Sequence, residues 1–356
     1  MRQTIIFTGL ALTVLYSYLS QRSSHVNQPK PKPWEIAFEQ PFDAAHAFHD
    51  GLAAIETGGK YGYIDKTGRV VIEPQFDEAK DFSGGMARVT IDYKVGYINQ
   101  RGEIVVKPQF EYAYDFSDGL ALVSSDERSA SYIDNTGKIV IKTRSRYVTE
   151  FSEGLAAVSG QRLTDSYNYI DPTGKIIIRT PFSAAQPFYE GLSRVLIEPE
   201  PKSNRGYGFI DRTGQVVIGP QFDAVGDRFS DGLAKVLVKN KWGYIDKTGK
   251  IVIAPNYEEA DDFSDGLARV KFAGVYGFIG KDGRSVVNPR FTIASPFSEG
   301  LASVLDRGKF GYIDRDGNFF IEPEFEAADS FSEGVALVLL SGKPVYIRLV
   351  KPVSPH

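Results

Sequence analysis

A segment of about 34 residues recurs along almost the whole of this 356-residue chain. Its clearest landmark is the phenylalanine of an F-S-(D/E)-G-L-A pattern, and successive phenylalanines are 34, 34, 35, 37, 41, 34, 34 and 34 residues apart. The landmarks are Phe48, Phe82, Phe116, Phe151, Phe188, Phe229, Phe263, Phe297 and Phe331. A fixed period is the signature of repeat architectures, in which each small unit buries its apolar surface against its neighbours. The chain is therefore expected to fold as one array of similar units.

Each unit contains three short patterns typical of β-strands, which predicts an all-β repeat protein. The patterns read L-A-R-V, K-W-G-Y-I-D and K-I-V-I-A-P, with β-branched and aromatic residues and a proline that ends the third. A D-x-(T/D)-G turn, such as residues 65–68, joins the second and third patterns as a hairpin, because aspartate bonds backbone N–H groups and glycine takes a positive φ. Residues 74–82 fit either a helical turn or a bent fourth strand.

The two ends of the array are complementary. Residues 36–42 align with the third strand pattern at 70–76, so the array opens on a third strand. The residues that follow Phe331 supply only the first two strands of a unit. Together the ends make one composite ninth unit, which predicts a closed, β-propeller-like toroid, because closure also removes exposed sheet edges. The alternative is an open β-solenoid in which the two end fragments are caps.

Residues 241–270, "KWGYIDKTGKIVIAPNYEEADDFSDGLARV", resemble the WG-repeat (KWG-repeat) family of bacterial proteins, and the resemblance covers about residues 36–350. Only Trp242 is the signature tryptophan; the equivalent residues elsewhere include Tyr61, Val95, Tyr207, Tyr276 and Phe310. The unit at 124–147 departs from the pattern, since it lacks the glycine before Tyr132 and the Pro-x-aromatic. The resemblance implies a binding or scaffolding module, often on exported or multidomain chains, without a family-wide catalytic residue.

The N-terminus has the layout of an export signal. An uncharged, mostly apolar run ends near Leu19, which predicts a signal anchor or signal peptide over residues 1–20. The uncleaved anchor is favoured, because no small-x-small cleavage site precedes Ser20. A linker at 21–33 containing proline and lysine then leads to the repeat array at 34–356. The expected location is the bacterial cell envelope, outside the cytoplasm, either membrane-anchored or secreted; the orientation and oligomeric state stay open.

Charge and cysteine content exclude several classes of function. A net charge of -4 and a pI near 5.7 provide no basic field for nucleic acid, so no nucleic-acid partner is expected. The absence of cysteine excludes disulfides, thiolate zinc sites and a cysteine nucleophile. His46, His49 and Asp50 have a spacing that suits zinc, but no third ligand recurs, so a surface histidine pair is expected instead. No cofactor and no metal site are predicted.

Variation in length is confined to one loop of the repeat. From the end of the first strand to the aromatic residue of the second, the distance is 8 residues in six units but 9, 11 and 14 in three consecutive ones. The long loops are residues 124–131, 159–168 and 196–208. Insertions at one loop type in neighbouring repeats project from one face, as in the binding sites of repeat proteins, although neutral drift is the alternative. The candidate binding residues are Asp126, Glu127, Arg128, Arg162, Asp165, Lys202, Arg205 and Tyr207.

No catalytic constellation stands out in the sequence. The chain has only four histidines and no G-x-S-x-G motif, and its acidic residues are scattered through every repeat. The expected function is therefore a non-enzymatic binding or scaffold module that presents the loop sector to a protein, a peptide or an envelope polysaccharide. The alternatives are a structural spacer or assembly protein and a carboxylate-dependent glycan hydrolase.

Overall fold

The computed structural model of the chain describes residues 32–39, 42–126, 129–145, 147–160, 166–198 and 206–350. The predicted signal anchor at 1–20 and the linker up to residue 31 lie outside these ranges. Every regular element within the ranges is a β-strand, so the described part of the chain offers no helix that could span a membrane. The all-β prediction is confirmed.

From Trp34 onward, the described strands form nine antiparallel sheets, which we call blades 1 to 9. Blade 1 comprises β2 (Ala44–Ala45), β3 (Leu52–Thr57), β4 (Lys60–Asp65) and β5 (Val70–Phe76). Blade 2 comprises β6 (Glu78–Ala79), β7 (Met86–Ile91), β8 (Lys94–Asn99) and β9 (Ile104–Phe110). Blade 3 comprises β10 (Tyr112–Ser117), β11 (Leu120–Ser124), β12 (Ser131–Ile133) and β13 (Ile139–Lys142). Blade 4 comprises β14 (Ala156–Val158), β15 (Asn168–Ile170) and β16 (Ile176–Arg179). In place of a first strand it has a single antiparallel β-bridge between Val148 and Val158.

The remaining blades repeat this order. Blade 5 comprises β17 (Ala185–Tyr189), β18 (Leu192–Ile197), β19 (Gly206–Ile210) and β20 (Val216–Ile218). Blade 6 comprises β21 (Ala224–Val225), β22 (Ala234–Val238), β23 (Lys241–Ile245) and β24 (Ile251–Tyr257). Blade 7 comprises β25 (Glu259–Ala260), β26 (Leu267–Phe272), β27 (Val275–Gly280) and β28 (Ser285–Phe291). Blade 8 comprises β29 (Ala302–Asp306), β30 (Lys309–Ile313) and β31 (Phe319–Phe325). Blade 9 comprises β32 (Ala327–Ala328), β33 (Val335–Leu340), β34 (Lys343–Leu349) and β1 (Trp34–Glu39).

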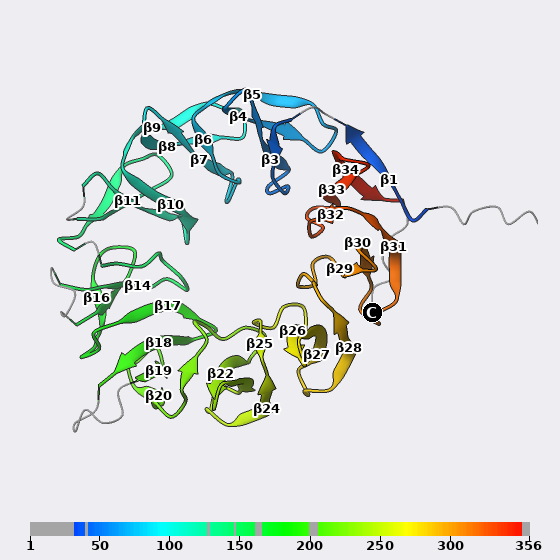
Figure 1. Ribbon diagram of the computed structural model, residues 1–356. Helices are drawn as coiled ribbons and strands as arrows, with labels where there is room; N and C mark the ends of the chain where they lie inside the picture. The colour runs from blue at the N-terminus through cyan, green and yellow to red at the C-terminus, as the bar shows by residue number, and fades with distance from the viewer. Residues whose placement is uncertain are drawn as a thin grey trace, which may run out of the picture. The chain divides into compact units, whose positions relative to one another are not determined.

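The blades form a closed ring. Figure 1 shows first strands such as β10 and β17 toward the centre and last strands such as β5, β24 and β28 on the outer rim. The N-terminal strand β1 pairs antiparallel with β34, so it supplies the outer strand of blade 9 and closes the ring. The predicted toroid of nine units, with the last unit shared by both ends of the array, is confirmed, and an open solenoid is excluded. The segment at 74–82 contains the end of β5 and the short strand β6 rather than a helical turn.

The antiparallel order gives the ring two different faces. Counting all four strands of a blade, the loop between the second and third strands, such as that from β3 to β4, emerges on the same face as the crossing to the next blade. We call this face the hairpin face. The F-S-(D/E)-G and D-x-(T/D)-G turns emerge on the opposite face, which we call the turn face. The turns have the predicted chemistry, since Asp65 Oδ1 accepts bonds from the backbone N–H groups of Thr67 and Arg69 at 2.9 and 3.1 Å.

The core lies between neighbouring blades and repeats from junction to junction. At the first junction, the rings of Tyr63 and Phe82 meet at a centroid distance of 4.8 Å, and the Tyr63 hydroxyl donates to the Lys80 carbonyl at 2.7 Å. Equivalent hydroxyl bonds are made by Tyr97, Tyr132, Tyr169, Tyr244, Tyr312 and Tyr346. Because a buried hydroxyl without a partner is costly, each of these bonds holds two blades in register.

The seam between blades 9 and 1 uses the contacts of the other junctions. The Tyr346 hydroxyl donates to the His46 carbonyl at 2.5 Å, and Ser332 Oγ donates to the Phe48 carbonyl at 2.6 Å. The Gly51 N–H donates to the Glu333 carboxylate at 2.9 Å. The ring is therefore closed by ordinary repeat chemistry between residues nearly 300 positions apart in the sequence.

The glycine of the W-G pattern is required by the outer strand. A Cβ atom on Gly62 would lie 2.4 Å from the Ile72 carbonyl oxygen and 2.6 Å from the Pro74 nitrogen, because a bulge carries β5 across this position. Blades 3 and 4 have Ser131 and Asn168 in place of the glycine, and their outer strands are four residues long instead of the seven of β5. The unit at 124–147 therefore departs from the repeat pattern without breaking the ring, and its short outer strand does not depend on the missing glycine alone, since β20 of blade 5 is three residues long although that blade keeps Gly208.

Candidate functional site

The three long loops leave the hairpin face of consecutive blades. They connect β11 to β12, β14 to β15 and β18 to β19 in blades 3, 4 and 5. Six of the candidate residues lie outside the described residues: Glu127, Arg128, Arg162, Asp165, Lys202 and Arg205. Asp126 and Tyr207 are described, but they lie in blades 3 and 5, so the structure does not bring them together.

Asp126 shapes the start of its own loop. Its Oδ1 accepts a hydrogen bond from the backbone N–H of Ser129 at 2.8 Å. The hydroxyl of Ser124 bonds the carbonyl oxygens of Asp126 and, at 2.6 Å, of Ser129. These bonds hold the loop against the end of β11, where Asp126 also lines a pocket.

Tyr207 packs beneath an arginine of its own blade. The Arg194 guanidinium carbon lies 4.4 Å from the centre of the Tyr207 ring, and Arg194 Nη2 pairs with Asp227 of blade 6 at 2.6 Å. Lys235 lies 5.9 Å from the ring of Trp242 in the same way, and Arg269 lies 4.7 Å from that of Tyr276. These three aromatic residues at the tryptophan position are thus covered by basic side chains, neither deep in the core nor free to form an exposed ring, whereas Tyr61 donates its hydroxyl to Glu56.

The same basic residues bridge neighbouring blades. Arg88 of blade 2 donates to the Ala113 carbonyl at 2.8 Å and pairs with Asp115 at 2.7 Å, both on the first strand of blade 3. Equivalent bridges run from Arg194 to Asp227, from Lys235 to Asp262 and from Arg269 to the Ala294 carbonyl. A basic residue in the L-A-(R/K)-V strand therefore spans the groove between its own blade and the next.

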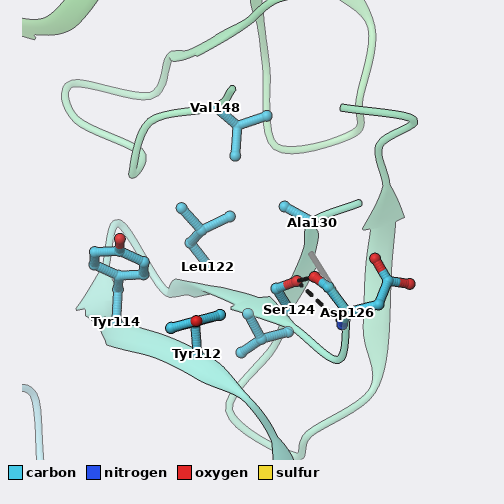
Figure 2. A pocket seen from close by; sticks show the side chains of 8 residues that line it. Tyr112, Tyr114, Leu122, Ser124, Asp126, Ala130 and Val148 are labelled. Carbon is cyan, nitrogen blue, oxygen red and sulfur yellow. Dashed lines mark hydrogen bonds between the residues drawn. The ribbon is translucent and has the colours of Figure 1, made fainter. Parts of the chain in front are cut away.

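Leu122 occupies this position in blade 3, and a pocket of about 290 Å³ opens between blades 3 and 4. We call it the tyrosine pocket; its walls are Tyr112, Tyr114, Leu122, Val123, Ser124, Asp126, Ala130 and Val148. Figure 2 shows Tyr112 and Tyr114 beside Leu122, with Val148 facing them and Ser124 and Asp126 at the other end. A leucine cannot bond a carbonyl or a carboxylate across the groove, so this junction lacks the bridge that Arg88, Arg194, Lys235 and Arg269 make at theirs.

Glu150 of blade 4 stands where Asp115 stands one blade earlier. Burial, and then the negative charge of Asp115, raise the pKa of the Glu150 carboxyl, while Arg88 opposes the shift. Leu122 supplies no positive charge to balance this carboxylate. The electrostatics of the junction therefore differ from those of the bridged junctions.

A β-bulge in β10 positions Tyr114, whereas Tyr112 pairs with Ser124 in regular register just before it. Ala113 pairs with Val123 and Phe116 with Ala121, so Tyr114 and Asp115 together face a single residue of β11. Bulges re-aim side chains and are common beside functional sites. Tyr112 and Tyr114 are 58% and 47% exposed, whereas the repeat tyrosine of the same blade, Tyr132, is fully buried.

A second pocket, of about 300 Å³, lies between blades 2 and 3 and also borders β10. We call it the charged pocket; its walls are Glu78, Lys80, Arg88, Thr90, Val95, Glu111, Tyr112, Ala113 and Tyr114. Lys94 pairs with Glu111 at its edge at 3.2 Å. Tyr112 and Tyr114 of β10 line both pockets. Strand β10 therefore separates the tyrosine pocket, which has aliphatic walls, from the charged pocket.

A third exposed tyrosine lies at the tip of the β7–β8 hairpin. Tyr93 has φ 62° and follows Asp92 at φ 50°, and its side chain is 94% exposed. The equivalent residue of the other two-residue hairpins is Gly59, Asn240, Gly274, Gly308 or Gly342. The left-handed conformation costs an ordinary residue about 1–2 kcal/mol, so this tyrosine is strained without being buried. Such strain is most often kept where a side chain makes a functional contact.

The sequence pattern does not single out these tyrosines, because most of the 24 phenylalanines and 19 tyrosines occupy core positions of the repeat. A position-by-position alignment of the units contains the signal. Tyr112 and Tyr114 stand where the preceding unit has Glu78 and Lys80. Tyr93 stands where other hairpins have glycine or asparagine.

The histidine pair of blade 1 contacts a carboxylate of blade 2. His46 Nδ1 lies 3.1 Å and His49 Nε2 lies 3.6 Å from the two oxygens of Asp81, whereas the Asp50 carboxylate accepts the N–H of Gly85. The hydrogen bond to Asp81 raises the pKa of His46, and the same bond lowers the pKa of Asp81. In the described part of the chain, no group of three His, Cys, Asp or Glu side chains is arranged to hold a metal ion.

A pocket of about 270 Å³ lies at the seam between blades 9 and 1. Leu337, which lines it, occupies the same repeat position as Leu122, so this junction also lacks a basic bridge. Its aromatic walls are Phe38, Phe42 and Tyr346, which belong to the seam itself. The tyrosine pocket differs because exposed tyrosines stand beside it.

Comparison with known proteins identifies the repeat. The family model described as "WG containing repeat" matches residues 42–61, 61–94, 96–128, 131–159, 169–198, 207–242, 242–275, 276–310 and 310–343. No curated protein matches the chain.

The chain is also similar to solved structures at low sequence identity. One is a eukaryotic initiation factor, at 13% identity and a TM-score of 0.48, covering 92% of this chain and 89% of that one. Another is BamB from Moraxella catarrhalis, at 10% identity and a TM-score of 0.43, covering 88% of this chain and 98% of that one. A third is the computationally designed Ika8 protein, at 12% identity and a TM-score of 0.47, covering 76% of this chain and 95% of that one. At such distances these likenesses carry no functional argument.

Proposed function

Because this chain belongs to the family of proteins built from the WG containing repeat, we propose that it is a non-enzymatic binding module that holds its partner on the hairpin face. A β-repeat propeller of this kind suggests a binding or scaffold role, and a rigid ring suits it, since the ligand meets a preformed surface. The partner is a protein, a peptide or an envelope polysaccharide.

The observation that carries the proposal is the junction between blades 3 and 4. Leu122 replaces the bridging basic residue there, and the tyrosine pocket opens beside two exposed tyrosines. Exposed tyrosines provide large, fairly rigid contact area at low conformational cost, which is why they are frequent in binding surfaces. The strained Tyr93 adds a third such ring on the same face.

We place this binding face outside the cytoplasm. The apolar run at residues 1–20 and the polar linker at 21–33 support export, with the ring tethered to the membrane or released from it. The described strands that flank the long loops at 124–131, 159–168 and 196–208 end on the same face, so we include these loops in the proposed binding surface. In this arrangement Asp126 belongs to both the loop and the pocket.

Site-specific photo-crosslinking in the native cell tests the proposal. The photoreactive residue p-benzoylphenylalanine replaces Tyr93 in one full-length variant and Phe272 in a matched control. Phe272 is also exposed, at 51%, but it ends β26 in blade 7, away from the tyrosines. We expect a discrete adduct from position 93 and none from position 272. Equal adduct yields from the two positions, or no adduct from either, would contradict a binding role for this sector.

A structural spacer or assembly protein is the second candidate, and one observation favours it. Outer strands carry exposed aliphatic pairs at the ring perimeter, namely Ile104 with Val105, Ile139 with Val140, Ile176 with Ile177, Val216 with Val217 and Ile251 with Val252. Such edges can pair with other strands. Sedimentation velocity over a wide concentration range tests this candidate. A spacer that assembles through its rim should form larger oligomers as the protein concentration rises. These oligomers should disappear when Val105 and Val140 are both replaced by lysine.

A further inference from the structure

We infer that the ligand of the tyrosine pocket is an extended peptide segment in which an aliphatic side chain and a basic one lie two residues apart. This inference rests on the proposed binding function and names the chemistry of its partner. The two pockets beside β10 carry the argument, because each selects a different kind of side chain.

The tyrosine pocket selects an aliphatic side chain. Leu122, Val123, Ala130 and Val148 supply apolar walls, and the polar groups at its end, Ser124 and Asp126, already bond within their own loop. A volume of about 290 Å³ accommodates a leucine or isoleucine side chain. A sugar would leave its hydroxyl groups against these aliphatic walls without hydrogen-bond partners, which is unfavourable.

The rim between the two pockets selects a basic side chain. Elsewhere in this molecule, exposed faces of rings are covered by cations, with Arg194 4.4 Å from the Tyr207 ring and Arg269 4.7 Å from the Tyr276 ring. The ring faces of Tyr112 and Tyr114 offer the same surface to a cation from outside the chain. Glu78 in the charged pocket supplies a carboxylate beside them.

The strand between the pockets sets the shape of the ligand. Both pockets border β10, so a chain that crosses this strand meets the aliphatic pocket and then the charged one within a few residues. An extended peptide advances about 3.3 Å per residue and turns successive side chains to opposite sides. A basic residue two positions from the aliphatic one, in either direction, therefore points to the same side and lies about 7 Å away.

An array of random ten-residue peptides, probed with the fluorescently labelled full-length chain, tests the inference. We expect the bound peptides to be enriched in an aliphatic residue two positions from a lysine or arginine, and a spacing of three should not be enriched because it turns the two side chains to opposite sides. The strongest peptide is then resynthesised and titrated by fluorescence anisotropy. Tyr112→Ala and Tyr114→Ala should each weaken its binding about tenfold, whereas Phe272→Ala should leave it unchanged.

Charge substitutions sharpen the assignment of the basic side chain. Glu78→Gln should weaken binding about two- to fivefold and reduce its dependence on salt, because it removes a partner of the ligand's positive charge. Lys80→Gln, its neighbour in the charged pocket, should leave binding equal or tighter. A stronger effect of Lys80→Gln than of Glu78→Gln would overturn the inference, since the ligand would then be acidic.

A soluble hexamer of β-1,4-linked N-acetylglucosamine separates the two ligand classes. If the hexamer binds and Tyr112→Ala abolishes that binding, while the peptides show no sequence preference, the peptide assignment is wrong and the proposed binding function still holds. If neither probe binds and position 93 also gives no photo-crosslinked adduct, both proposals fail. Peptide binding that is insensitive to Tyr112→Ala and Tyr114→Ala would overturn the inference by placing the ligand elsewhere.

Discussion

The junction between blades 7 and 8 and the junction between blades 3 and 4 differ at the bridging repeat position and at the residues around it, since Tyr114 and Ala130 stand where blade 7 has Asp261 and Tyr276. At the first, Arg269 bonds the Ala294 carbonyl of the next blade, pairs with Asp261 at 2.7 Å and stacks on Tyr276. At the second, Leu122 reaches none of these partners, and the tyrosine pocket opens. The same fold thus contains closed and open grooves between otherwise similar blades.

This difference shows where the repeat tolerates variation. At the open junction the Tyr132 hydroxyl donates to the Thr149 carbonyl, and Tyr312 makes the same bond to Asp329 between blades 8 and 9, whereas Phe278 has no hydroxyl to donate at the junction of blades 7 and 8. Register between blades is therefore maintained without the basic bridge.

The bridging position varies along the ring. Ala54, Ala157 and Ser303 occupy it in blades 1, 4 and 8. A pocket also lies beside Arg88 at a bridged junction, so the tyrosine pocket depends on Leu122 together with the residues around it.

The largest expected effect comes from opening a closed junction. Arg269→Leu removes an ion pair, a bond to a carbonyl and a stacking contact, and it leaves the Ala294 carbonyl without this donor. We expect the free energy of unfolding to fall by about 2–3 kcal/mol, measured by denaturant titration. Arg284→Leu is the matched control, because Arg284 is 88% exposed and should matter by less than about 0.5 kcal/mol. Equal losses in the two variants would show that the bridge is not structural.

A smaller effect is expected from removing one of the tyrosine hydroxyl bonds between blades, which occur at junctions with and without a basic bridge. Tyr132→Phe at the open junction and Tyr244→Phe at the closed junction between blades 6 and 7 each remove one buried hydroxyl bond, of 2.6 and 2.7 Å. Each should lower the free energy of unfolding by about 1 kcal/mol. The natural residues Phe209 and Phe278 show that phenylalanine fits this position. A loss confined to one of the two junctions would contradict the view that the tyrosine hydroxyl bond stabilises bridged and unbridged junctions alike.

The smallest effect concerns pH at the junction of blades 1 and 2. Asp81 raises the pKa of His46 above its ordinary 6.5, so the pair stabilises the fold fully below that pH and loses this contribution as the pH rises through the folded-state pKa. The lowered pKa of Asp81 sets the acid limit, since the contribution is lost again as the pH falls through that value, below 3.8. His49 and Lys80 also face this carboxylate and act on it with the same sign.

Denaturant titrations at pH 5.5 and 8.5 measure this contribution. His46→Gln should cost more stability at pH 5.5 than at pH 8.5, by less than about 1 kcal/mol because both side chains are partly exposed. Asp81→Asn should show the same pH dependence, and the double variant should add nothing further. A larger cost at pH 8.5 would reverse the assigned sign.

The closure of the ring could be predicted because the two end fragments of the array complete one another. Residues 36–42 match the outer strand pattern, and β1 takes that place beside β34. The loop that contains Asp126 could be recognised in the sequence as one of the three longer loops, because the spacing there exceeds the common eight residues. The tyrosine pocket could not, because Leu122 looks like any apolar residue of a strand until Arg88 is seen to cross to the next blade. Tyr114 likewise resembles a core aromatic until the bulge in β10 is known.

The most direct test of the open junction as a binding site is to close it. Leu122→Arg places a guanidinium where Arg88 lies one blade earlier, within reach of Glu150 and the Val148 carbonyl. The measurement is the yield of the photo-crosslinked adduct from position 93 with and without Leu122→Arg, together with the melting temperature. We predict a yield reduced about tenfold at an unchanged or higher melting temperature. An unchanged yield in a folded variant would contradict the account, because the partner would then not need the open groove.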